Sequence, residues 1–137
     1  MKFTVLGKSI GKQRPKFSRK GNYVTTYTPI KTVAYEKFVK LSALEQCNKE
    51  LNKEYTGPVK MAIKAYFRPN KAISKKNYNS LIGKPYLKKS DADNIAKIIC
   101  DSLNGVAYKD DKQISILYVE KLYDDEERVE VKIEYEK

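Results

Sequence analysis

Carboxylates and one lysine gather in two short segments of this 137-residue chain. Asp91, Asp93 and Lys97 lie in the first segment, and Asp110 and Asp111 lie in the second. Carboxylates that converge on one spot repel one another unless a cation lies between them, and hard divalent metal ions prefer oxygen ligands. The two segments therefore predict metal-assisted chemistry if the fold brings them together.

The charge of the chain is unevenly distributed around a formal net charge of +11. Residues 1–90 hold 21 Lys and Arg against 4 Glu, a surplus of 17 positive charges, whereas residues 91–137 hold 7 basic and 13 acidic residues, a surplus of 6 negative charges. Lys and Arg that neutralise phosphates release counterions, so a basic surface is typical of nucleic-acid binders. A solvated, solubilising face is the alternative for any single charge run. The basic half and the acidic cluster together favour metal-dependent chemistry on a polyanion.

The chain has no histidine. This excludes a histidine general base, a Ser-His-Asp triad and histidine-containing zinc sites, and leaves catalysis to carboxylates, lysine, tyrosine or metal-bound water. Cys47 and Cys100 form neither a disulfide framework nor a metal-ligand spacing, a usage that suits the reducing cytoplasm. No segment resembles a signal peptide or a membrane span, so we expect a cytoplasmic protein without a membrane partner.

Length and periodicity predict one domain over residues 1–137. In its first half we expect a strand near residues 3–5, a basic loop over 7–21, an extended piece at 23–27, a helix from 28 to about 52, and a strand over 59–68. Thr28 and Pro29 suit the start of the helix. Its apolar stripe, which we expect to face the core, consists of Ala34, Phe38, Leu41, Leu44 and Leu51.

Residues 69–89 predict a long basic connection in which lysines alternate with Tyr78 and Tyr86. Long loops inside compact domains are often functional, and this composition suits phosphate contacts combined with stacking on unpaired bases. A surface loop without function is the alternative for any one of these residues. The loop ends directly at Asp91, which favours the functional interpretation.

The helix expected after this loop has two different faces. Asp93, Lys97 and Asp101 recur every four residues on the side opposite its apolar residues, although an Asp–Lys pair at this spacing is common on protein surfaces. The apolar side consists of Ile95, Ile98, Ile99, Ser102 and Leu103, and Asn104-Gly105 suits the helix end.

Strands are expected at about residues 113–121 and 129–135. The order strand, helix, strand, helix, strand, strand predicts an α+β domain with a mixed sheet and two main helices. In such a domain the loop before the second helix and the loop before the third main strand can meet. This would bring Asp91 and Asp93 together with Asp110 or Asp111.

The pattern Lys-Ser-Asp-Ala-Asp-Asn-x-x-Lys-x-x-x-Asp-x-Leu-Asn-Gly at residues 89–105, followed by Asp-Asp-x-Gln-Ile at 110–114, resembles the RusA family of Holliday junction resolvases of bacteria and their phages. Gly-Lys-Gln-Arg-Pro-Lys-Phe at residues 11–17 also resembles the N-terminal loop of that family. Many members have proline before the first aspartate of the motif, where this chain has Ser90. Because serine is an N-cap residue, we expect the metal site to be kept.

The resemblance implies a RusA-like homodimer that uses Mg²⁺, or Mn²⁺ in its place, to nick two strands of a four-way DNA junction. Asp91, Asp93 and Asp111 match the metal-binding aspartates of the family, Asp110 matches the neighbouring acid, and Lys97 matches the lysine essential for cleavage. The residues expected to contact DNA are Lys12, Gln13, Arg14, Lys16, Lys75, Lys76, Lys88 and Lys89.

Two alternatives remain open at the level of sequence. Another metal-dependent, structure-selective nuclease, acting on flaps or single strands, would share the acidic residues and differ in substrate. A non-catalytic DNA-binding module would not need them. The number of metal ions per site, and a cellular or prophage source, are also left open.

Overall fold

A computed structural model describes residues 1–12, 16–21, 23–27 and 29–136, with side chains omitted for residues 16–18, 20 and 23–27. Its elements are, in order, β1 (Lys2–Leu6), β2 (Lys16–Lys20), β3 (Tyr23–Tyr27), α1 (Ile30–Cys47), β4 (Val59–Phe67), α2 (Lys75–Leu81), α3 (Ala92–Ser102), a 3-10 turn (Asp111–Gln113), β5 (Ile114–Tyr123) and β6 (Arg128–Tyr135). The α+β class predicted from the sequence is confirmed.

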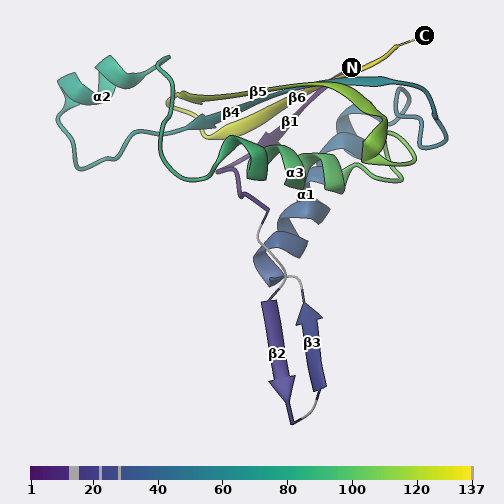
Figure 1. Ribbon diagram of the computed structural model, residues 1–137. Helices are drawn as coiled ribbons and strands as arrows, with labels where there is room; N and C mark the ends of the chain where they lie inside the picture. The colour runs from purple at the N-terminus through teal and green to yellow at the C-terminus, as the bar shows by residue number, and fades with distance from the viewer. Residues whose placement is uncertain (13–15, 22, 28, 137) are drawn as a thin grey trace.

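A mixed four-stranded sheet in the order β1-β6-β4-β5 forms the body of the molecule. β6 is antiparallel to both β1 and β4, whereas β4 and β5 are parallel. A parallel pair needs a long crossover connection, and α2 and α3 lie within it. In Figure 1, α1 and α3 lie on the same side of this sheet, and the two-stranded hairpin β2-β3 extends away from the body beyond the N-terminal end of α1.

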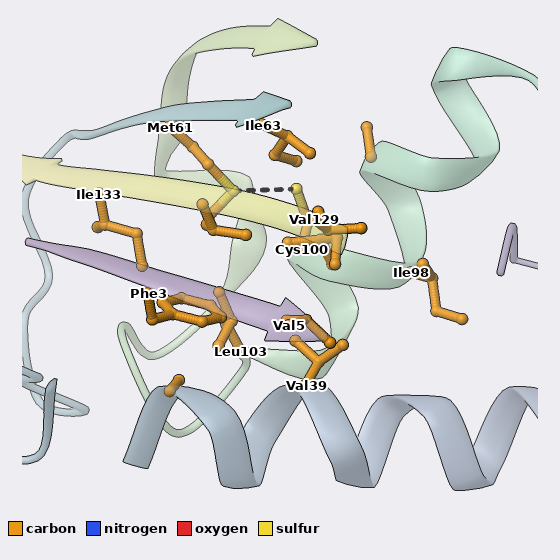
Figure 2. Packing of buried hydrophobic residues seen from close by; sticks show 14 of the residues in the cluster. Phe3, Val5, Val39, Met61, Ile63, Ile98, Cys100, Leu103, Val129 and Ile133 are labelled. Carbon is orange, nitrogen blue, oxygen red and sulfur yellow. Dashed lines mark hydrogen bonds between the residues drawn. The ribbon is translucent and has the colours of Figure 1, made fainter. Parts of the chain in front are cut away.

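The core fills the space between the sheet and these two helices. In β4, the residues Val59, Met61, Ile63, Ala65 and Phe67 are buried and alternate with exposed or half-buried neighbours, which confirms the period-two pattern of the sequence. Figure 2 shows Phe3 and Val5 of β1 between the sheet and Val39 of α1, with Ile98 and Leu103 close by. The predicted apolar face of α3 is confirmed, because Ile95, Ile98 and Ile99 are fully buried.

The predicted orientation of α1 is wrong. Its core face consists of Thr32, Tyr35, Val39, Ser42, Ala43 and Cys47. Phe38, Leu41 and Leu44, expected in the core, are instead 44%, 55% and 39% exposed, and Ala34 is exposed too. The helix has apolar residues on two opposite sides, so periodicity alone does not identify the side that faces the sheet. The helix also ends at Cys47 instead of about residue 52, which leaves Leu51 half-buried outside it.

Two further differences lie in segments that the sequence predicts as loops. Residues 69–89 contain the short helix α2, whose start is capped by the Ser74 Oγ accepting a hydrogen bond from the Asn77 N–H at 3.2 Å. α2 buries none of its residues, so it carries no apolar periodicity to predict it. Residues 16–20 form a strand rather than loop, paired with the predicted extended piece at 23–27. α1 has Pro29 as its N-cap position, and Thr28, the expected cap, lies outside the described residues.

Candidate active site

The polar face of α3 presents three of the predicted residues to solvent. Asp91 is the N-cap residue, Asp93 lies in the first turn, and the Lys97 Nζ lies 3.6 Å from the Asp101 Oδ2 one turn further on. Burial of the isoleucine face against the sheet fixes this orientation, since residues four apart share one side of a helix. Asp91, Asp93 and Lys97 are exposed, whereas Asp101 is half-buried.

A pinned loop brings the second acidic segment to the C-terminal end of α3. The buried Tyr108 hydroxyl donates a hydrogen bond to the Cys100 carbonyl at 2.7 Å. The Gln113 Nε2 donates to the carbonyls of Tyr55 and Gly57 at 2.7 and 3.0 Å. Asp110 caps the short 3-10 turn, because its Oδ1 accepts from the Lys112 N–H at 2.9 Å. These bonds hold Asp110 and Asp111 in place.

Asp101 and Asp111 form a close carboxyl pair at this end of the helix. A hydrogen bond between their carboxyl groups, followed by burial and the hydrogen bond with Asp110, raises the pKa of Asp111 to about 6. The backbone N–H of Lys112 and the hydrogen bond from Asp111 lower the pKa of Asp110. Below about pH 6 the raised pKa of Asp111 favours its protonated form, as expected where carboxylates converge without a cation between them.

Lys12 connects the Asp101–Asp111 pair to Glu36 of α1. Its Nζ lies 2.6 Å from the Glu36 Oε1 and 3.4 Å from the Asp101 Oδ2, and its side chain is only 18% exposed. Burial acts to lower the pKa of Lys12, but the hydrogen bond to Glu36 and the charges of Glu36 and Asp101 outweigh it, and the pKa is raised. The sequence predicted Lys12 as a phosphate contact, whereas its ammonium group here bridges two carboxylates.

The predicted acidic residues lie in two places along α3. Asp93 and Asp101 are eight residues apart, which is about 12 Å along a helix axis. None of the hydrogen bonds or ion pairs in the described part of the chain joins Asp91 or Asp93 to Asp110 or Asp111. Over residues 1–12, 16–21, 23–27 and 29–136, no group of three or more Asp, Glu or Cys side chains is arranged to hold a metal ion together.

The donor chemistry at the C-terminal end of α3 nevertheless fits a hard divalent ion. Asp101 and Asp111 offer carboxylate oxygens, the ligands that Mg²⁺ and Mn²⁺ prefer. The raised pKa of Asp111 reflects repulsion between these carboxyl groups, which a bound cation would relieve. The sequence places Asp101 on the polar face, four residues after Lys97, but predicts no metal-binding role for it.

An open groove of about 790 Å³ lies beside the other end of α3. Backbone contacts shape it, because the Lys12 N–H donates to the Asn94 carbonyl at 2.9 Å and the Lys121 Nζ donates to the Lys88 and Ser90 carbonyls at 2.7 and 2.8 Å. Gly11 is needed where these segments meet, since a Cβ there would come within 3.1 Å of the Asn94 and Ser90 Cβ atoms. The charged residues that line the groove are Lys8, Lys12, Lys31, Lys88, Lys89 and Asp91.

The structure gathers some of the predicted DNA contacts and separates others. Lys12, Lys88 and Lys89 share the groove, together with Lys8 and Lys31, which the sequence analysis did not select. Lys75 and Lys76 are exposed on α2, which Figure 1 shows at one end of the sheet, and they do not line the groove. Gln13 and Arg14 lie outside the described residues, as does the side chain of Lys16.

Spaced aspartates and a lysine on the exposed face of α3, beside a lysine-lined groove, suit a protein that acts on a nucleic-acid backbone. Comparison with known proteins agrees. Residues 7–134 match the family model "Endodeoxyribonuclease RusA", and the chain belongs to this family. It is also 36% identical over 137 residues to "Uncharacterized protein YqaN" of Bacillus subtilis (strain 168), covering 97% of this chain and 94% of the relative. No helix in the described residues is long and apolar enough to cross a membrane.

Proposed function

We propose that the chain is a divalent-metal-dependent endodeoxyribonuclease that nicks four-way DNA junctions as a homodimer. The observation that carries this proposal is the polar face of α3, where Lys97 stands one turn from an Asp101–Asp111 carboxyl pair and a groove lined by lysines begins at Asp91. Membership of an endodeoxyribonuclease family supports hydrolysis of DNA. The choice of a four-way junction rests on the resemblance of the motif at residues 89–114.

Asp101 and Asp111 would hold the metal ion, with Asp110 beside them. Asp91 and Asp93, the further predicted ligands, belong to the same helix face. A divalent ion held by these carboxylates would lower the pKa of a water molecule and neutralise charge on the scissile phosphate. Asp111 has to release its proton before both carboxylates can act as ligands, so ion binding is coupled to deprotonation of this pair.

Lys97 is the residue placed to act on the phosphate itself. Its side chain is 62% exposed, and its Nζ lies on the side of α3 that carries the aspartates. A positive charge aimed at this position stabilises the additional negative charge of a pentacovalent phosphate. The lysines of the groove would meanwhile contact backbone phosphates, which position the DNA without reading its sequence.

Nicking of a synthetic four-way junction, compared with a flap, a single strand and plain duplex, tests this function. We expect cutting of the junction with Mg²⁺ or Mn²⁺ and none with EDTA. Asp93→Asn and Lys97→Ala should each abolish cutting while junction binding survives. Lys132→Ala is a matched control, since Lys132 is also an exposed lysine in an ion pair, at 3.0 Å from Glu134.

The alternatives give different results in the same assay. Preference for flap or single-stranded DNA would identify another structure-selective nuclease. Junction binding without metal-dependent cutting would identify a non-catalytic module. Wild-type cutting rate and metal dependence in the Lys97→Ala variant would overturn the assignment of Lys97.

A further inference from the structure

The outer face of α1 is apolar and exposed to solvent. It carries Ile30, Val33, Phe38, Leu41 and Leu44, which are 86%, 39%, 44%, 55% and 39% exposed. At 3.6 residues per turn these side chains lie on the side of the helix opposite its core face, so none of them is needed to hold α1 on the sheet. A continuous apolar face on the surface of a soluble protein marks an interaction site.

Charges on this face are arranged symmetrically about Leu41. Lys37 lies four residues before Leu41 and Glu45 four residues after it, while Phe38 and Leu44 lie three residues before and after. Lys37 and Glu45 are exposed, and neither takes part in an ion pair within the described part of the chain. The central part of this face, residues 37–45, is therefore complementary to itself when its direction is reversed.

We propose that a second copy of this chain covers the outer face of α1, with the two α1 helices antiparallel and a two-fold axis passing at Leu41. In this register Lys37 lies opposite the partner's Glu45, Phe38 lies opposite the partner's Leu44, and each contact occurs twice, as a two-fold interface requires. The inference rests on the dimer of the proposed function and assigns a surface to it.

The same surface borders the acidic end of the site. Val33, Lys37 and Lys40 line a hollow of about 280 Å³ together with Lys12, Glu36, Asp101 and Ser102. An α1–α1 contact therefore places one carboxyl pair on each side of the two-fold axis, beside the interface. Two sites in this fixed relation match a substrate in which two symmetry-related strands are cut.

The open edge of β5 is the competing surface. Ile116, Leu117 and Tyr118 are 47%, 47% and 49% exposed there, and exposed edge strands can pair with another chain. The charged residues nearest to these side chains, Glu120 and Lys121, both follow them, and residues 113–115 carry no charge, so β5 lacks the symmetric charge pair found on α1. We therefore favour α1 and use β5 as the control.

Sedimentation velocity over a range of protein concentrations tests the interface. We expect a wild-type dimer that Leu41→Glu converts to monomer, with an unchanged circular dichroism spectrum because Leu41 is exposed. Leu117→Glu should leave the dimer intact. Lys37→Glu and Glu45→Lys should each raise the dissociation constant at least about tenfold, and the charge-swapped double variant should recover most of this loss.

Several results would overturn the inference: a monomeric wild type, a Leu41→Glu variant that stays dimeric, a dimer dissolved by Leu117→Glu, or a double variant no tighter than its parents. Nicking assays on the same proteins separate this outcome from failure of the proposed function. If the charge-swapped double variant recovers dimerisation but the protein cuts no DNA, the proposed function is wrong and the proposed interface stands. If Asp93→Asn abolishes cutting but no α1 variant changes dimerisation, the proposed function stands and the proposed interface is wrong.

Discussion

α1 and α3 pack on the same side of the sheet but show opposite designs. α3 buries isoleucines on one face and presents charged residues on the other. α1 buries Val39 and Ala43 on its inner face and exposes Phe38 and Leu41 on its outer face. The outer face of α3 is thus compatible with water and with a charged substrate, whereas the outer face of α1 is left exposed by the side chains that the structure describes. Under the two proposals above, α3 would carry the chemistry and α1 would mediate association.

The largest expected effect lies on the outer face of α3. Asp101→Asn keeps the shape of the side chain but removes the negative charge that pairs with Lys12 and Lys97 and that lies beside Asp111. We expect nicking to fall by at least about 100-fold with junction binding retained. Asp125→Asn, in the exposed turn before β6, is the control and should cut normally. Equal rates for both variants would show that the polar face of α3 has no catalytic role at Asp101.

Truncating a side chain on the inner face of either helix should lower the free energy of unfolding more than truncating one on the outer face of α1. Ile98→Ala and Val39→Ala remove fully buried side chains, so we expect urea unfolding to show losses of about 3 and about 2 kcal/mol. Leu41→Ala, measured at a concentration where the protein is monomeric, should change the free energy of unfolding by less than about 0.5 kcal/mol. A large loss for Leu41→Ala would mean that the outer face of α1 is packed within one chain.

How far the sequence predicts these faces depends on the helix. The face of α3 followed from the sequence because only one side of it is apolar, and β4 followed from strict alternation. The face of α1 did not, because two apolar sides compete and the inner one includes Thr32 and Ser42. The pairing of Asp101 with Asp111 was not predicted either, since it depends on the loop that Tyr108 and Gln113 pin in three dimensions.

Lys12 bridges Glu36 of α1 and Asp101 of α3 and offers a smaller test. Lys12→Met keeps the length of the side chain but leaves Glu36 and Asp101 without their shared cation. We expect the free energy of unfolding to fall by about 1 kcal/mol, the usual contribution of a hydrogen bond in a partly buried charged network. Lys53→Met, in an exposed turn after α1, should have no measurable effect. Equal stability of the two variants would show that the link contributes nothing.

The smallest effect concerns the pH dependence of stability without metal. The pKa of Asp111 is raised from 3.8 to about 6, so the folded protein binds a proton that the unfolded chain releases between these values. The stability contributed by this group is present below about pH 4 and is lost as the pH rises through about 6. At pH 7 we expect Asp111→Asn to melt roughly a few degrees higher than wild type.

Comparing melting temperatures at pH 4 and pH 7 tests whether carboxylate repulsion causes the higher melting temperature of Asp111→Asn. At pH 4 the advantage of Asp111→Asn should disappear, because Asp111 of the wild type is then protonated. Added Mg²⁺ should raise the melting temperature of the wild type more than that of the variant. An advantage that persists unchanged at pH 4 would point to a cause other than carboxylate repulsion.

The position of β1 in the sheet affects when this protein becomes competent during its synthesis. β1 lies at the edge of the sheet, and its neighbour there is β6, which ends at Tyr135. β1 can therefore join the sheet only after the ribosome has added β6. Until then, the segment after β1 that contains Lys12, which contacts the start of α3, is not attached to the sheet. Contacts so distant in sequence form slowly. A polypeptide released before β6 is made would therefore carry the aspartates without the strand that joins β1 to β4.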